Sequence, residues 1–298
     1  MTSLMSIEIA SQPACWLDIL NRRLEIEEFF SGTGGRMAFL GCGTSFHMAG
    51  AMAKLREAAG LGGSDVFPAS ESPSTRRYPW VAAVSRSGTT TELIDALDSF
   101  EGRAHRLVIT AVESSPLAEM ADRLFVLDRA DEQSVVQTRF ATTCLCVMRA
   151  HLGHDVASLA SSCQSALNEG VPDGLDRVER FVFLGSGWAS AIAAEAALKM
   201  TEAAGVMCES YPAYEYRHGP MSAAGSGTLI WRIGAIDPSL SAEIENMGVA
   251  LEGGGQDPQI ELVAVQRAAE QLARHRGRDP DSPPHLNRSV ILETRAGQ

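Results

Sequence analysis

The segment 197–220 contains two residues that can transfer protons, Glu202 and His218. An Ala-rich run, 189–204, predicts a helix that includes Glu202. Lys199 lies three residues earlier, so its side chain shares a helix face with Glu202. His218 lies in a loop between two prolines, where a side chain can be directed into a cleft. The pair is suited to proton transfer on a small substrate; the alternative is a solvated Lys/Glu pair and an unrelated loop histidine.

A second segment, Ser85-Arg-Ser-Gly-Thr-Thr90, is rich in hydroxyl groups. It follows an expected strand, 80–84, and precedes an expected helix, 92–100. The N–H groups and hydroxyls at a helix N-terminus bind anions such as phosphate. An ordinary N-cap needs only one hydroxyl, whereas positions 85–91 contain five hydroxyl residues. The segment is therefore predicted to bind phosphate.

Other motifs are incomplete. The chain contains no P-loop and no nucleophile elbow. Gly41-Cys-Gly43 and Gly185-Ser-Gly187 each form half of a dinucleotide fingerprint without its third glycine, so NAD is not expected. The run His151-Leu-Gly-His-Asp155 is interpreted as a solvated helix end rather than a metal site. We expect neither a metal nor a cofactor.

Composition restricts the class of protein. The 298 residues suffice for two domains, and the net charge of −12 argues against a nucleic-acid or membrane surface. We find no secretory signal, no CxxC pair and no apolar run long enough to span a membrane. The six cysteines lie mostly in apolar runs, which indicates reduced thiols. A cytoplasmic protein is expected.

The chain is predicted to contain an internal duplication. Strands alternate with helices, which predicts a parallel, doubly wound sheet. Three segments of the first half recur in order in the second, with offsets of 144, 145 and 144 residues. The repeated pairs are Phe39-Leu-Gly-Cys-Gly43 and Phe183-Leu-Gly-Ser-Gly187, Lys54-Leu-Arg-Glu-Ala-Ala-Gly60 and Lys199-Met-Thr-Glu-Ala-Ala-Gly205, and Phe67-Pro-Ala-Ser-Glu71 and Tyr211-Pro-Ala-Tyr-Glu215. Two α/β domains follow from this pattern.

We expect three regions: a helical lead-in over 1–35, a first domain over 36–155 and a second domain with a C-terminal tail over 156–298. The second domain is expected to be smaller, because Gly-rich sequence replaces two of its strands. A helix is expected near 243–251 and a last strand over 289–292. The two domains are expected to join through a Ser/Gly/Asp-rich segment, 152–178.

Four segments together resemble the sugar isomerase (SIS) domain family. They are Gly41-Cys-Gly-Thr-Ser45, Ser85-Arg-Ser-Gly-Thr-Thr90, Glu132-Gln-Ser-Val-Val-Gln-Thr138 and Ala197–Pro220. The ending Asp279–Val290 is also similar, especially to the galactosamine-6-phosphate deaminase/isomerase branch. The resemblance covers roughly residues 36–293 and implies two tandem, flavodoxin-like SIS domains in a homodimer with shared active sites.

The resemblance also implies roles for individual residues. Ser85, Ser87 and Thr90 would hold the phosphate of a sugar phosphate, and Ser45 with the Val135–Gln137 segment (Val135 and Gln137 included) would line the sugar. Glu202 would move a proton between C1 and C2, supported by Lys199 and Glu195. His218 would assist ring opening in the active site of the partner subunit. This chemistry needs a carboxylate and an acid/base group and no cofactor.

Two positions depart from the family pattern. Arg86 replaces a common Gln and would add a cation beside the phosphate. Arg288 stands near a C-terminal Lys that engages the open-chain sugar in relatives, and an arginine forms no ready imine.

The sequence therefore predicts a phosphosugar aldose–ketose isomerase or an amino-sugar-6-phosphate deaminase. A fructosamine-6-phosphate deglycase would use the same residues, and release of a free amino acid would identify it. A non-catalytic phosphosugar sensor would keep the loop 85–90 but would not need Glu202 and His218.

Overall fold

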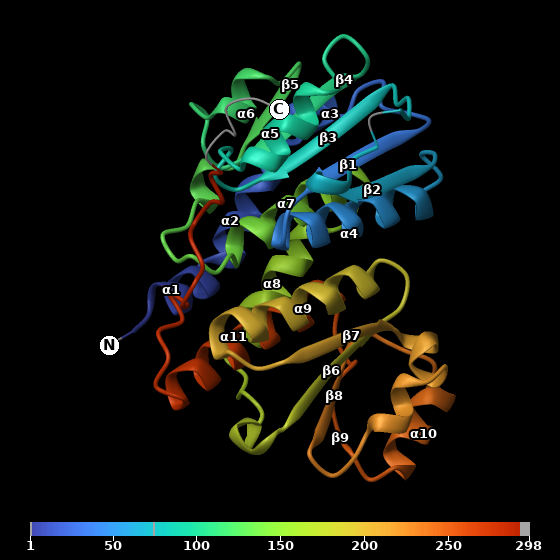
Figure 1. Ribbon diagram of the computed structural model, residues 1–298, viewed down its shortest axis with the longest axis vertical. Coiled ribbons are helices and arrows are strands. Elements are labelled where there is room, and N and C mark those ends of the chain that lie inside the picture. Colours follow the sequence, from blue (N-terminus) through green and yellow to red (C-terminus); the bar gives the residue numbers. More distant parts are fainter. Residues whose placement is uncertain (1, 74, 293–298) are drawn as a thin grey trace.

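The computed structural model describes residues 2–73 and 75–292, and two parallel sheets dominate it (Figure 1). The first sheet has five strands in the order β2-β1-β3-β4-β5. Its strands are β1 (Met37–Gly41), β2 (Ser64–Pro68), β3 (Trp80–Ser85), β4 (His105–Thr110) and β5 (Arg123–Val126). The helices between these strands are α4 (Thr44–Ala58), α5 (Thr91–Asp98) and α6 (Pro116–Glu119). The central strand β1 is buried at every position, as its apolar run predicts.

The second sheet has four strands in the order β7-β6-β8-β9, and is the smaller, as expected. Its strands are β6 (Arg180–Gly185), β7 (Cys208–Pro212), β8 (Thr228–Ile233) and β9 (Ala250–Gly253). Its helices are α9 (Ala189–Ala204), α10 (Pro238–Asn246) and α11 (Pro258–His275). The helix predicted near 243–251 lies earlier than expected: α10 spans Pro238–Asn246, Gly248 takes a positive φ of 69°, and β9 follows at Ala250–Gly253. The α/β class with parallel sheets is confirmed.

A group of helices lies between and beside the sheets (Figure 1). They are α1 (Leu4–Ala10), α2 (Gln12–Leu20), α3 (Arg23–Phe29), α7 (Arg139–His151) and α8 (Val156–Ala166). Helix α8 corrects the expectation of a linker at 152–178, because its Val156, Leu159, Ala160 and Cys163 are buried at helical spacing and Asp155 caps it. One continuous hydrophobic core includes residues of α4, α7, α9 and α11 and so joins both halves.

Five short 3₁₀ helices complete the described elements. They are η1 (Ala69–Glu71), η2 (Asp128–Ala130), η3 (Leu175–Arg177), η4 (Ala213–Arg217) and η5 (Pro220–Ala223). No helix within the described ranges is long and apolar enough to cross a membrane.

The chain beyond α11 runs back from the second sheet to the first (Figure 1). The strand expected over 289–292 is absent from the described residues. Instead, the Thr91 amide donates to the Val290 carbonyl at 3.2 Å, and the Leu292 amide donates to Thr91 Oγ1 at 2.9 Å. This segment contacts the start of α5 rather than the edge of a sheet, so it forms no strand ladder.

Candidate active site

The candidate site lies at the carboxyl edge of the first sheet. Strand β1 pairs with β2 on one side and with β3 on the other, so the chain reverses its winding direction between β1 and β3. Ligands of open α/β sheets bind in the crevice at such a switch point. Thr44 and Ser45 follow β1, and Ser85 ends β3, so the switch point brings two predicted motifs side by side.

A glycine is required where each central strand meets its helix. A Cβ at Gly41 would lie 2.5 Å from the Ser45 backbone, and a Cβ at Gly185 would lie 2.3 Å from the Ala189 carbonyl oxygen. Real Cβ atoms do not approach backbone so closely, and glycine permits the contact. The half fingerprint found after both strands therefore reflects close packing of helix on strand.

The predicted phosphate segment forms a tight loop between β3 and α5, which we call the anion loop (residues 85–90). Gly88 has a φ of 66°, and a Cβ there would lie 2.0 Å from Ser115 Oγ. The Gly88 amide donates to Ser85 Oγ at 3.0 Å, and the Thr89 amide donates to Ser87 Oγ at 3.3 Å. Thr90 is the N-cap residue of α5, yet its side chain makes no capping hydrogen bond. The hydroxyls therefore exceed what capping needs, as anion binding requires.

Helix α9 places three charged residues on one face. Glu195, Lys199 and Glu202 follow at i, i+4 and i+7, and Lys199 forms ion pairs with Glu195 at 3.5 Å and with Glu202. Lys199 Nζ also donates to Thr44 Oγ1 of α4 at 2.8 Å. This last contact joins the acid–base cluster of the second half to the helix that begins beside the anion loop.

Burial separates the roles within this cluster. The side chains of Glu195 and Lys199 are fully buried, whereas that of Glu202 is 20% exposed. Desolvation by burial raises the pKa of Glu195 to about 7, although Lys199 opposes this shift. Burial disfavours the Lys199 ammonium, but Glu195 and Glu202 together raise its pKa. Lys199 therefore stays charged, and of these three side chains only Glu202 can reach a ligand.

His47 adds an imidazole that the sequence analysis missed. It lies three residues after Thr44 on the same face of α4 and is partly buried. Burial, and then the nearby Lys199 charge, lower the pKa of His47 to about 4. Its imidazole is thus neutral at pH 7. The sequence could have indicated His47 through its spacing from the Gly41-Cys-Gly-Thr-Ser45 motif.

The structure does not bring Glu202 and His218 together within one chain. Glu202 lies near the end of α9, about 20 Å along the helix axis from its first residue. Strand β6 leads into α9, and Gly185 at its end pairs with Pro212, which precedes η4. His218 follows η4, which packs against β6 and β7, and it is exposed. The two residues therefore lie toward opposite ends of α9.

Arg86 does not stand free beside the anion loop. Its guanidinium is 1% exposed and donates to the carbonyls of Ser134 at 2.8 Å and Val135 at 3.3 Å. It also donates to the Arg288 carbonyl at 3.0 Å and lies 3.7 Å from the buried carboxylate of Glu132. The Arg86 side chain, which was expected to add a cation beside the phosphate, is therefore already bound to backbone carbonyls and paired with the buried carboxylate of Glu132.

The remaining predicted residues differ in their contacts. Val135 is held through its amide, which donates to the Asp281 carbonyl at 2.9 Å. Gln137 is half-buried, and its Oε1 has no hydrogen-bond partner among the described residues. The Arg288 side chain pairs with Asp131. Ser45 is buried at the first turn of α4.

The second half lacks an equivalent anion loop. The chain after β8 reads Gly234-Ala-Ile-Asp237, and the Asp237 carboxylate caps α10 by accepting from the Ser239 and Leu240 amides. A carboxylate at this position repels phosphate. The described residues thus contain a hydroxyl-rich loop on the first sheet and an acidic cap on the second.

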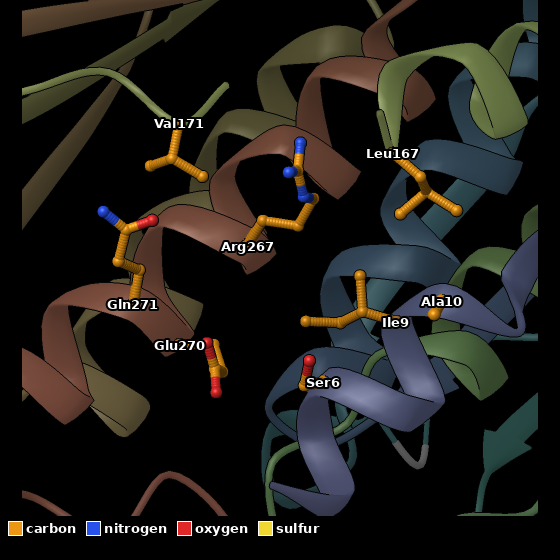
Figure 2. A pocket seen from close by; sticks show the side chains of 8 residues that line it. All are labelled: Ser6, Ile9, Ala10, Leu167, Val171, Arg267, Glu270 and Gln271. Atoms are coloured by element: carbon orange, nitrogen blue, oxygen red, sulfur yellow. The ribbon is translucent and has the colours of Figure 1, made fainter. Parts of the chain in front are cut away.

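A separate cavity of about 280 Å³ lies away from these residues, between α1 and α11 (Figure 2). Figure 2 shows that the two helices present side chains to it from opposite sides. Arg267 donates to the Ala166 and Glu169 carbonyls, and Glu270 accepts from Ser3 Oγ. Its lining includes no residue of the predicted site, so we assign it no role.

Comparison with known proteins shows which families and structures this chain is similar to. Residues 174–239 match the family model of the SIS domain, and the expected resemblance to that family is confirmed. Among solved structures, the chain is similar to glucosamine-6-phosphate deaminase from Thermotoga maritima, with 25% identity and a TM-score of 0.77 over 93% of this chain and 100% of that one. It is also similar to tagatose-6-phosphate ketose/aldose isomerase from Escherichia coli, with 21% identity and a TM-score of 0.80 over 98% of each chain.

Curated relatives are larger proteins. The glutamine–fructose-6-phosphate aminotransferase (isomerizing) of Aeropyrum pernix is 26% identical over 96% of this chain and 57% of its own length. The enzyme of the same name from Xanthomonas campestris is 27% identical over 97% of this chain and 59% of its own length. The chain thus spans somewhat more than half of the curated relatives it matches.

Proposed function

We propose that this protein is a phosphosugar aldose–ketose isomerase or amino-sugar-6-phosphate deaminase. The observation that carries the proposal is the Lys199–Thr44 hydrogen bond, because it fixes the acid–base cluster of α9 beside the anion loop. The similar proteins include a sugar-phosphate deaminase, a sugar-phosphate isomerase and an isomerizing aminotransferase, which supports this class of activity.

The geometry supports separate roles for the anion loop and for the acid–base cluster of α9. The anion loop would hold the phosphate through its amides and the Ser85, Ser87 and Thr90 hydroxyls. Glu202, the partly exposed member of its cluster, would remove the proton from one of C1 and C2 of the open-chain sugar and return it to the other. Lys199 would orient the Glu202 carboxylate through their ion pair, and buried Glu195 would hold Lys199 in place.

A ligand screen tests the substrate class. We expect hexose 6-phosphates and amino-hexose 6-phosphates to raise the melting temperature, because a ligand at about 100 times its Kd adds roughly 2.7 kcal/mol to the free energy of unfolding. The measurement is thermal unfolding with each sugar phosphate and with its unphosphorylated counterpart as the control. Stabilisation by the free sugars alone, or by no compound, would contradict the proposed phosphate site.

We further infer a homodimer with shared active sites. The separation of Glu202 from His218 supports this arrangement, since His218 of a second copy would have to complete the site. The proposal includes two tandem, doubly wound domains, 36–155 and 156–298, after a helical lead-in. Corresponding strand–glycine–helix units, β1 with α4 and β6 with α9, support the duplication. The six free cysteines are compatible with a cytoplasmic location.

Mixing two inactive variants tests the shared site. Glu202→Gln and His218→Ala should each be inactive alone, and subunit exchange between them should restore activity. In a mixed dimer one site has both wild-type residues and the other has neither, so random exchange should restore about a quarter of wild-type turnover. Turnover is measured after the mixture is unfolded and refolded together, with each variant refolded alone as the control. No recovery in a mixture that forms mixed dimers would refute sharing.

A further inference from the structure

The C-terminal residues 281–292, which we call the strap, cross the mouth of the anion loop. The strap begins at Asp281, whose carboxylate accepts the amides of Leu4 at 2.8 Å and Met5 at 2.7 Å. Farther along, Val290 and Leu292 bond to Thr91 at the start of α5. The strap is thus anchored to α1 at one end and to the anion loop side of the first sheet at the other.

Ser289 brings a hydroxyl of the strap into the loop. Its Oγ accepts from Ser87 Oγ at 3.1 Å and from Thr89 Oγ1 at 2.9 Å. Because Ser87 belongs to the predicted phosphate site, the position of the strap decides how open that site is to solvent. A contact that holds the backbone at residue 288 therefore affects how open the site is to solvent.

Arg86 is the group that holds this part of the strap. Its Nη1 donates to the Ser134 carbonyl. Its Nη2 donates both to the Val135 carbonyl and to the Arg288 carbonyl. Buried Glu132 balances the charge at 3.7 Å. Glu132 is itself fixed, because its Oε1 accepts the Thr138 and Arg139 amides at 2.6 and 2.8 Å.

We propose that Arg86 is a positioning residue that fastens the strap over the anion loop, and that it is not a ligand of the bound anion. A phosphate-binding arginine directs its N–H groups toward the anion. Here both Nη atoms are directed to backbone carbonyls, those of Ser134 and Val135 and that of Arg288 in the strap. A single guanidinium therefore couples the strap to the segment 134–135.

Limited digestion with trypsin tests this role, because the bond after Arg288 contains the carbonyl that Arg86 holds. In Arg86→Gln we expect cleavage after Arg288 to be faster than in wild type by roughly tenfold or more, as expected from losing a hydrogen bond with a charged donor. Arg86→Lys should behave similarly, since one ammonium cannot reach all three carbonyls. The readout is the intact mass of the fragment ending at Arg288.

Arg56→Gln is the matched control. Arg56 is as buried as Arg86 and also donates to backbone carbonyls, at Gly35, Leu61 and Gly62, but within the described part of the chain it forms no hydrogen bond with the strap. It should destabilise the protein without exposing the Arg288 bond. Equal cleavage in wild type and Arg86→Gln, or equal acceleration in Arg56→Gln, would overturn the proposal.

Wild-type protein provides two further readouts. Should both Arg86 variants fail to fold, hydrogen exchange of the Leu292 amide tests whether the strap is fastened. A fastened strap protects this amide, and exchange at the rate of a free peptide would refute the proposal. Adding glucosamine 6-phosphate to wild type should not accelerate cleavage after Arg288, whereas an anion that drew Arg86 away would accelerate it. This digestion with the sugar phosphate rests on the proposed function. If the sugar phosphate does not bind, the comparison of the Arg86 and Arg56 variants is unaffected.

Discussion

Glu202→Gln should fold like the wild type and lose turnover by about 10²–10⁴-fold, the usual contribution of a general base. Glutamine keeps the size and polarity of the side chain but cannot accept the proton. Glu202 is the partly exposed member of a cluster in which Glu195 and Lys199 are fully buried, so neither neighbour can replace it. The measurement is turnover of the best sugar phosphate, with thermal unfolding to verify the fold.

The proposed duplication provides the control for this variant. Glu57 would be the repeat mate of Glu202; it lies exposed near the end of α4 and accepts a hydrogen bond from the Ser64 amide. Glu57→Gln should therefore keep wild-type turnover. Unchanged turnover in Glu202→Gln would contradict the catalytic assignment, and equal losses in both variants would indicate a structural effect common to the repeats.

Lys199→Met should cost about 3–5 kcal/mol in the free energy of unfolding at pH 8, because it leaves a buried carboxylate without its cation. Lys199 lies 3.5 Å from fully buried Glu195. Burial raises the pKa of that carboxyl to about 7, and the charge of Lys199 opposes the rise. Without the ammonium, the Glu195 pKa should rise further. Methionine fills a similar volume, so the loss reports mainly on charge.

The pH dependence of this loss has a definite sign. The Glu195 pKa is already higher in the folded protein than its ordinary value of 4.5. A raised folded pKa means that stability is present below pH 4.5 and is lost as the pH rises through the folded value. The cost of Lys199→Met should thus be smaller at pH 5.5 than at pH 8, as measured by urea unfolding.

Lys54→Met is the matched control, because Lys54 corresponds to Lys199 in the proposed duplication. Lys54 is exposed and donates to the Gly187 carbonyl and the Ser190 hydroxyl, so its loss should cost only about 0.5 kcal/mol at either pH. A Lys199→Met variant no less stable than Lys54→Met at pH 8 would show that the buried charge is compensated in another way.

Local sequence determined the two strand–turn–helix motifs, because their signals are short-range. Five hydroxyl residues around Gly88 suffice to predict a loop at a helix N-terminus, and the i, i+3 spacing of Lys199 and Glu202 suffices to predict an ion pair. The repeated Phe-Leu-Gly-x-Gly segments likewise predicted two related sheets. The prediction of a strand at 289–292 was wrong, because the Val290 carbonyl accepts from the Thr91 amide and the Leu292 amide donates to Thr91 Oγ1, so this apolar run bonds to the start of α5 rather than to a strand.

Only the tertiary structure decided which of these residues work together. The Thr44–Lys199 contact joins residues 155 positions apart and depends on the packing of α4 against α9. His218 is close to Glu202 in sequence, yet α9 separates them. Arg86 is a cation next to a predicted phosphate loop, but the folded chain surrounds it with three carbonyls from segments 48 to 202 residues away. Residue type and spacing thus fixed the chemistry available, while long-range packing fixed which groups share one site.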